Sequence, residues 1–155
     1  MGSQAIRKEN FEKILREVHI HIARLEQSFE ELSKLFSFPL SDTDFQEIIE
    51  NPLYLAFADQ IIYRFSKAQD TIGGKLFKAY LLVQGENIDK PFLDILNSLE
   101  KIDIVDVDEW FELREIRNEI AHDYENSDEH GKDVLNTIYK HKGELSRIAE
   151  SIVMG

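Results

Sequence analysis

The chain has 155 residues, of which 30 are acidic and 18 basic, giving a formal net charge of -12 at pH 7. This length fits one domain with a continuous hydrophobic core, and the lack of cysteine excludes a disulfide framework, a thiolate zinc site and a cysteine nucleophile. The acidity argues against a protein that coats nucleic acid through its overall charge, so any contact with RNA must be local.

Nothing in the sequence suggests insertion into a membrane. No apolar run approaches bilayer length, and the first residues are polar and charged where a signal peptide would need an apolar segment. We therefore expect a cytoplasmic protein with a single domain over residues 1–155, in which residues 1–4 are disordered or left over from cloning.

The first predicted helix carries apolar residues at alternating steps of four and three, which mark one long amphipathic helix. Its apolar positions are Phe11, Leu15, Val18, Ile22, Leu25, Phe29, Leu32 and Phe36. Pro39 is expected to end it, and residues 41–51 are expected to form a connector with a short helical piece.

Asn51 and Pro52 form a cap and first-turn pair that predicts the start of a second long helix. We expect Gly73 and Gly74 to bend this helix or to allow close packing before residues 76–83 resume it, and Gly85 to end it. Its buried face is expected to consist of Leu53, Phe57, Ile61, Phe65, Ala68 and Ile72.

Three more helices are predicted towards the C-terminus. Asp89 and Pro91 begin a short third helix, Asp106 and Glu109 have the spacing of a capping box that begins a fourth, and Ser127 can cap a fifth. No strand-like alternation and no internal repeat is evident. The sequence therefore predicts an all-α fold, an antiparallel up-down bundle of four or five helices.

Residues 117–124, with the sequence Arg-Asn-Glu-Ile-Ala-His-Asp-Tyr, are the most informative part of the chain. They place a permanent cation (Arg117), a titratable imidazole (His122) and a phenol (Tyr124) within two turns of the fourth predicted helix. This set suits the handling of a phosphodiester. The alternative is an ordinary solvated helix whose arginine and histidine have no chemical role.

The expected core stripe of this helix consists of Leu113, Ile116 and Ile120. At about 100° per residue, Arg117 and Tyr124 flank the stripe, whereas His122 points nearly the opposite way. The helix could end or bend before His122, the stem of Arg117 could wrap around it, or a second subunit could supply half of the site. We favour two-fold pairing along this helix, which joins two copies of Arg117 and His122 in one cationic pocket.

Two further polar residues are candidates for supporting roles. Asn118 lies four residues before His122, on its side of the helix, where it could orient the imidazole, touch a substrate or simply be solvated. Asp70, on the second long helix, could orient either motif side chain from the facing helix. It could equally form a plain salt bridge with Arg64 or Lys67.

Residues 117–124 resemble the R-x4-6-H signature of the HEPN superfamily. In this segment an arginine is followed directly by an asparagine, a histidine lies five residues after the arginine, and a tyrosine lies two residues after the histidine. The match is to the R-x4-H-x-Y form found in HepT-like toxins. The resemblance extends to the helical layout, to the chain length and to residues 64–70, which look like the stretch facing the motif in related bacterial toxins. It covers the whole chain, and residues 117–124 are its specific part.

The resemblance implies the toxin of a type VII-like toxin-antitoxin pair, a homodimeric RNA endonuclease that needs no metal and no other cofactor. Arg117 would stabilise charge on the phosphorus, and two copies of His122 would act as general base and general acid. The products would be a 2',3'-cyclic phosphate and a 5'-hydroxyl.

Tyr124 has two interpretations. Its position beside the core stripe suits a buried tyrosine with a solvated hydroxyl. The resemblance implies instead that it is the residue to which a partner nucleotidyltransferase, the MntA-type antitoxin, adds AMP, placing negative charge beside Arg117 and silencing the nuclease. Alternative functions are a catalytically inactive HEPN partner or substrate-binding subunit of a nucleotidyltransferase, and a plain dimeric helical adaptor.

Overall fold

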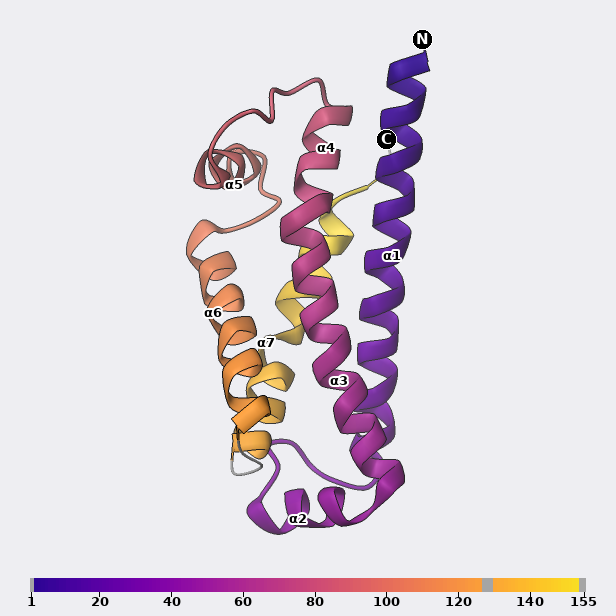
Figure 1. The fold of residues 1–155 in the computed structure, drawn as a ribbon, viewed down its shortest axis with the longest axis vertical. Helices are drawn as coiled ribbons and strands as arrows, with labels where there is room; N and C mark the ends of the chain where they lie inside the picture. Colours follow the sequence, from indigo (N-terminus) through magenta and orange to yellow (C-terminus); the bar gives the residue numbers. More distant parts are fainter. Residues whose placement is uncertain (1, 127–129, 154–155) are drawn as a thin grey trace.

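The computed structural model of the chain describes residues 2–126 and 130–153, and that part is helical without any strand (Figure 1). The all-α prediction is confirmed for these residues. In chain order the elements are α1 (Gly2–Ser33), α2 (Asp42–Glu50), α3 (Pro52–Thr71), the π-helical turn η1 (Ile72–Leu76), α4 (Phe77–Val83), α5 (Phe92–Glu100), α6 (Val107–Asn126) and α7 (Gly131–Ser151).

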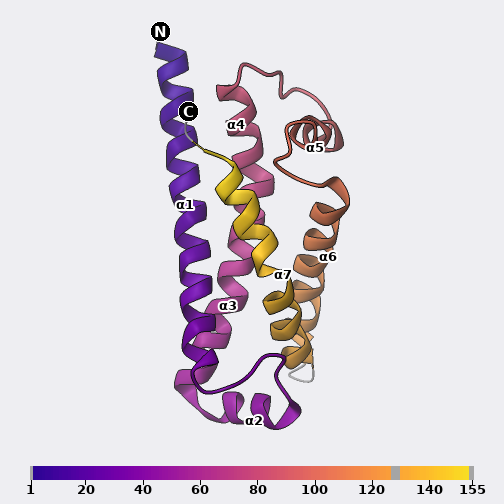
Figure 2. The ribbon, with the colours of Figure 1, turned by 180° about the vertical axis from the view of Figure 1, so that it is seen from behind.

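The long helices run lengthwise and alternate in direction. From its N-terminus α1 descends in Figure 1, and α3, η1 and α4 rise beside it as one continuous stretch. On the other side of this stretch α6 descends, and α7 rises to pack against α1, α3 and α6, as Figure 2 shows from behind. The short helices α2 and α5 cross the two ends. None of the helices in the described residues is both long and apolar enough to span a bilayer.

Helix α1 buries the predicted apolar face but ends earlier than expected. Residues 2–4, expected to be disordered or left over from cloning, form its first turn. The helix ends at Ser33, where the amides of Leu35 and Phe36 both donate to the carbonyl of Leu32 in a closing turn. Phe36 is nevertheless buried, because it reaches the core from that turn. The apolar spacing therefore continued past the end of the helix.

The start of α3 matches its prediction closely. The Oδ1 atom of Asn51 accepts hydrogen bonds from the amides of Leu53 (2.9 Å) and Tyr54 (3.3 Å), and Pro52 occupies the first turn. Ile61, Phe65, Ala68 and Ile72 are fully buried, and Phe57 packs partly buried against the core. Leu53 does not belong to this face, since the first turn of α3 leaves it 60% exposed.

Gly73 lies where the second long helix meets α6. A Cβ atom at this position would lie 2.7 Å from Cζ2 of Trp110, a fully buried residue of α6, whereas nothing lies within 4 Å of a Cβ atom at Gly74. The helix adopts a π-turn over Ile72–Leu76 at the same level. Gly85 has a positive φ of 82° and follows the last residues of α4, as predicted for a helix stop.

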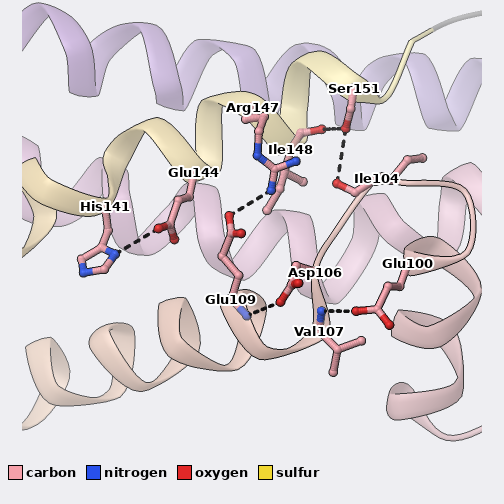
Figure 3. A network of polar contacts seen from close by, with 10 residues as sticks. All are labelled: Glu100, Ile104, Asp106, Val107, Glu109, His141, Glu144, Arg147, Ile148 and Ser151. Atoms are coloured by element: carbon pink, nitrogen blue, oxygen red, sulfur yellow. Dashed lines mark hydrogen bonds and ion pairs between the residues drawn. The ribbon is translucent and has the colours of Figure 1, made fainter.

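Figure 3 shows how α5, α6 and α7 are joined. Asp106 caps α6 by accepting from the amide of Glu109 at 2.9 Å, which is one half of the predicted capping box. The carboxylate of Glu109 binds Arg147 on α7 (2.9 Å), and Glu100 at the end of α5 accepts from the amide of Val107 (2.8 Å). Ser127, predicted to cap the fifth helix, lies outside the described residues.

Candidate functional site

Helix α6 carries the whole of residues 117–124. It extends to Asn126 and therefore passes through His122, which excludes the arrangement in which the helix ends before the imidazole. The predicted core stripe is confirmed: Leu113, Ile116 and Ile120 are 0%, 7% and 3% exposed. The backbone thus fixes the angular positions of the motif residues around the helix axis.

Arg117 forms a two-pronged ion pair with Asp70 across the interface between α6 and α3. Its Nε donates to Oδ1 and its Nη2 to Oδ2 of the carboxylate, both at 3.1 Å. The side chains are 27% and 44% exposed, so the pair lies at the surface. Asp70, predicted to face the motif, therefore contacts its arginine, while Arg64, the alternative partner, binds His21 instead.

The pair with Asp70 fixes the orientation of the Arg117 guanidinium more than it stabilises the fold. A solvent-exposed ion pair contributes about 0–1 kcal/mol to stability, but two parallel N–H···O bonds hold the guanidinium plane in one position. The pair uses two of the five N–H donors of the arginine. Arg117 is therefore held on the side of α6 that faces α3.

The structure does not place the other motif side chains. His122 and Tyr124 belong to α6, but their side chains lie outside the described part of the chain. Asn118 is exposed. On a regular helix the Cα of His122 lies about 140° around the axis and about 7.5 Å along it from that of Arg117. The two residues thus start from different sides of α6.

A second cluster of ionisable side chains lies between α1 and α3 and was not predicted from the sequence. The Nη1 atom of Arg64 lies 2.9 Å from Nδ1 of His21, and Glu17 lies 3.8 Å from Nε2 of the same ring. Because a guanidinium can only donate, Nδ1 accepts and the ring is neutral with its proton on Nε2. Burial, followed by the nearby charge of Arg64, lowers the pKa of His21. The spacing of Glu17 and His21, one helical turn apart, could have suggested their contact. The contact of His21 with Arg64 could not be read from local spacing, because the two residues are 43 positions apart.

Gln69, next to Asp70 on α3, is also unusual. It is fully buried, and among the described residues neither its amide nitrogen nor its amide oxygen has a hydrogen-bond partner. Trp110 likewise buries its Nε1 without a partner in that part of the chain. Sequence spacing placed an apolar face here, so a buried amide was not anticipated.

The site thus consists of an oriented arginine on α6, its carboxylate partner on α3 and an exposed asparagine one residue further along α6. A scan of protein-family models, a search of curated proteins and a search of solved structures find no match for this chain. Support for a function therefore comes from the residues of the chain and their geometry.

Proposed function

We propose that this protein is a HEPN-superfamily RNA endonuclease of the HepT-like kind, which acts as the toxin of a type VII-like toxin-antitoxin pair. The pair between Arg117 and Asp70 supports this proposal most strongly. It joins the motif arginine to residues 64–70, the stretch expected to face the motif, and presents an oriented guanidinium at the surface. Such a group suits the binding of a phosphate oxygen.

The same geometry favours a homodimer that pairs along α6. Arg117 is held towards α3, so its stem does not wrap towards His122, and α6 does not end before His122. Two-fold pairing fits both observations, as does a bend of α6 before His122, and we favour pairing because it joins two copies of Arg117 and His122 in one cationic pocket. A second copy of α6 would bring its own His122 towards the Arg117 of the first copy.

The chemistry follows from these groups. One imidazole removes the proton of a ribose 2'-hydroxyl, whose oxygen forms a bond to the adjacent phosphorus while the bond to the 5'-oxygen breaks. The imidazolium of the second His122 gives its proton to the departing 5'-oxygen. The guanidinium donors not used by Asp70 stabilise the charge on the phosphoryl oxygens. The products are a 2',3'-cyclic phosphate and a 5'-hydroxyl, and no metal takes part.

Cleavage of RNA in the presence of EDTA tests this function. Wild-type protein should cleave, and Arg117→Ala and His122→Ala should each abolish cleavage with unchanged circular dichroism, because each substitution removes a group to which the proposed mechanism assigns a chemical role. Arg114→Ala is the matched control, since Arg114 is an exposed arginine of the same helix and should be dispensable. Cleavage by either motif variant would contradict the assigned roles. A wild-type protein that binds a nucleotidyltransferase but never cleaves RNA would favour the inactive-partner alternative.

We further propose that Tyr124 is the residue that an MntA-type nucleotidyltransferase modifies with AMP. An added phosphate beside Arg117 would compete with the substrate for the guanidinium. Incubation with the nucleotidyltransferase and ATP should add adenylyl mass to the wild type and to Tyr139→Phe, which removes another exposed phenol, but not to Tyr124→Phe. An unchanged mass increment in Tyr124→Phe would place the acceptor elsewhere.

A further inference from the structure

The second long helical stretch is basic, although the protein is acidic. Between positions 60 and 85 the sequence has four basic residues and one acidic residue, whereas the whole chain carries -12. The single acid is Asp70, which is paired with Arg117. The four basic residues are Arg64, Lys67, Lys75 and Lys78. Positive charge is therefore concentrated on the helix that contacts the motif arginine.

Two of these four basic residues, Lys67 and Lys78, lie on one solvent-facing stripe, and Arg64 and Lys75 lie beside it. Exposed residues recur at positions 63, 67, 70, 74 and 78, at steps of four, three, four and four, which is the spacing of one helix face. At about 1.5 Å per residue, Tyr63 and Lys78 lie roughly 10 Å from Asp70 along the axis, in opposite directions. The Arg117–Asp70 pair is thus near the middle of the stripe.

Tyr63 offers a flat aromatic surface at one end of the stripe. Its side chain is 49% exposed. The guanidinium carbon of Arg64 lies 5.2 Å from the ring centroid and the ammonium nitrogen of Lys67 lies 5.9 Å from it. An exposed ring flanked by cations has the composition of a site where a nucleobase stacks and the neighbouring phosphates are neutralised.

A cleft continues the positive surface at the other end. Lys75 and Lys78 line it from η1 and α4, and Lys13 lines it from α1. Its volume is about 360 Å³, and Asn10 and Glu17 also contribute to its walls. Three ammonium groups around one open cleft, against a single carboxylate, favour a phosphate-bearing ligand.

We propose that these residues form a binding track for single-stranded RNA, which runs along α3, η1 and α4 and passes the RNA backbone over the Arg117–Asp70 pair. The basic track consists of Tyr63, Arg64, Lys67, Lys75, Lys78 and Lys13. The inference rests on the proposed nuclease function and extends it to the substrate. A single strand is specified because a base must be unstacked from its neighbours to lie on the ring of Tyr63.

The track is tested with a fluorescein-labelled, single-stranded 2'-O-methyl oligoribonucleotide of mixed sequence. This probe keeps the phosphates but has no 2'-hydroxyl to attack, so binding is measured without cleavage. In the variant with Lys75→Ala and Lys78→Ala, the slope of log affinity against log salt should become shallower by about 1.4, at about 0.7 per lost phosphate contact. The double variant with Lys101→Ala and Lys140→Ala, which removes two exposed lysines elsewhere, should keep the wild-type slope.

The aromatic end is tested separately. Tyr63→Leu should weaken binding about 5-fold or more, whereas Tyr63→Phe, which keeps the ring, should bind like the wild type. Equal affinity and salt slope in the track variants and the control variant would overturn the track, as would equally tight binding of a duplex probe. If the wild type cleaves RNA but the track variants bind the probe as the control variant does, the binding track is overturned and the nuclease function is not. Binding through the track without cleavage of ordinary RNA would overturn the nuclease function alone.

Discussion

The guanidinium of Arg117 is oriented by a contact that adds little to the stability of the fold. The carboxylate of Asp70 accepts two hydrogen bonds of 3.1 Å from it at the protein surface. A surface ion pair of this kind is typically neutral for stability, but it removes the rotational freedom of a long side chain before a ligand arrives. Under the proposed nuclease function, this preorganisation is the useful property, because the guanidinium would meet a phosphate in the transition state.

His21 makes the stability of the protein sensitive to pH. In the unfolded chain this imidazole titrates near its ordinary pKa of 6.5, whereas burial and Arg64 lower its pKa in the folded chain. The unfolded state therefore binds the proton first as pH falls. As pH falls below about 6.5, the free energy of unfolding should decrease until the pH reaches the lower pKa of the folded state. Well above about pH 6.5 the imidazole is neutral in both states, so His21 should make no contribution to the pH dependence there. Glu17, which also faces the ring, opposes part of this shift, while Lys67 adds to it.

Urea unfolding measured between about pH 7 and pH 5 checks this expectation. His21→Gln should lose less stability over that interval than the wild type does. His19→Gln, which changes an exposed histidine two residues earlier, should behave like the wild type. A His21→Gln variant with the wild-type pH dependence would show that another group is responsible.

At the scale of the elements, the contact between η1 and α6 requires a glycine. The Cβ atom of an alanine at position 73 would lie 2.7 Å from the buried ring of Trp110. Gly73→Ala should therefore lower the free energy of unfolding by about 1–3 kcal/mol. Gly74→Ala, the matched control, meets open space and should be neutral or stabilising by up to about 1 kcal/mol.

Urea denaturation followed by fluorescence is a suitable measurement, because Trp110 is the only tryptophan of the chain and lies at the contact itself. The emission of Gly73→Ala should also differ from that of Gly74→Ala in the native state. Equal stability of the two variants would mean that α6 can move away from η1 at no cost.

The helices could be predicted from sequence because they depend on local spacing and caps, whereas the position of Asp70 opposite the motif was expected only from the resemblance of residues 64–70 to the stretch facing the motif in related toxins. Asn51 and Pro52 mark a helix start by their own chemistry. The end of α1 could not be predicted, since Phe36 keeps the apolar spacing while packing from a turn. The contact of His21 with Arg64 depends on how α1 docks on α3, which no local pattern encodes.

Over the whole molecule, a local basic region contrasts with the acidic net charge of the chain. The chain carries -12, yet the stretch from α3 to α4 and the motif arginine form a basic region. A net acidic charge limits unspecific attraction to nucleic acid, so the proposed RNA binding would be confined to the region where the track and Arg117 lie. The proposed activity therefore needs only local positive charge.

In the proposed dimer two copies of α6 share one catalytic site, and cross-linking through a single introduced cysteine tests this arrangement most directly because the chain has no cysteine of its own. Asn118→Cys lies on the exposed surface of α6, and Asn97→Cys, on the exposed surface of α5, is the matched control. With a short bismaleimide, Asn118→Cys should be captured as a covalent dimer in high yield, and Asn97→Cys should stay monomeric on a denaturing gel. Equal and low cross-linking of both variants, together with cleavage of RNA by a species that sediments as a monomer, would contradict this arrangement.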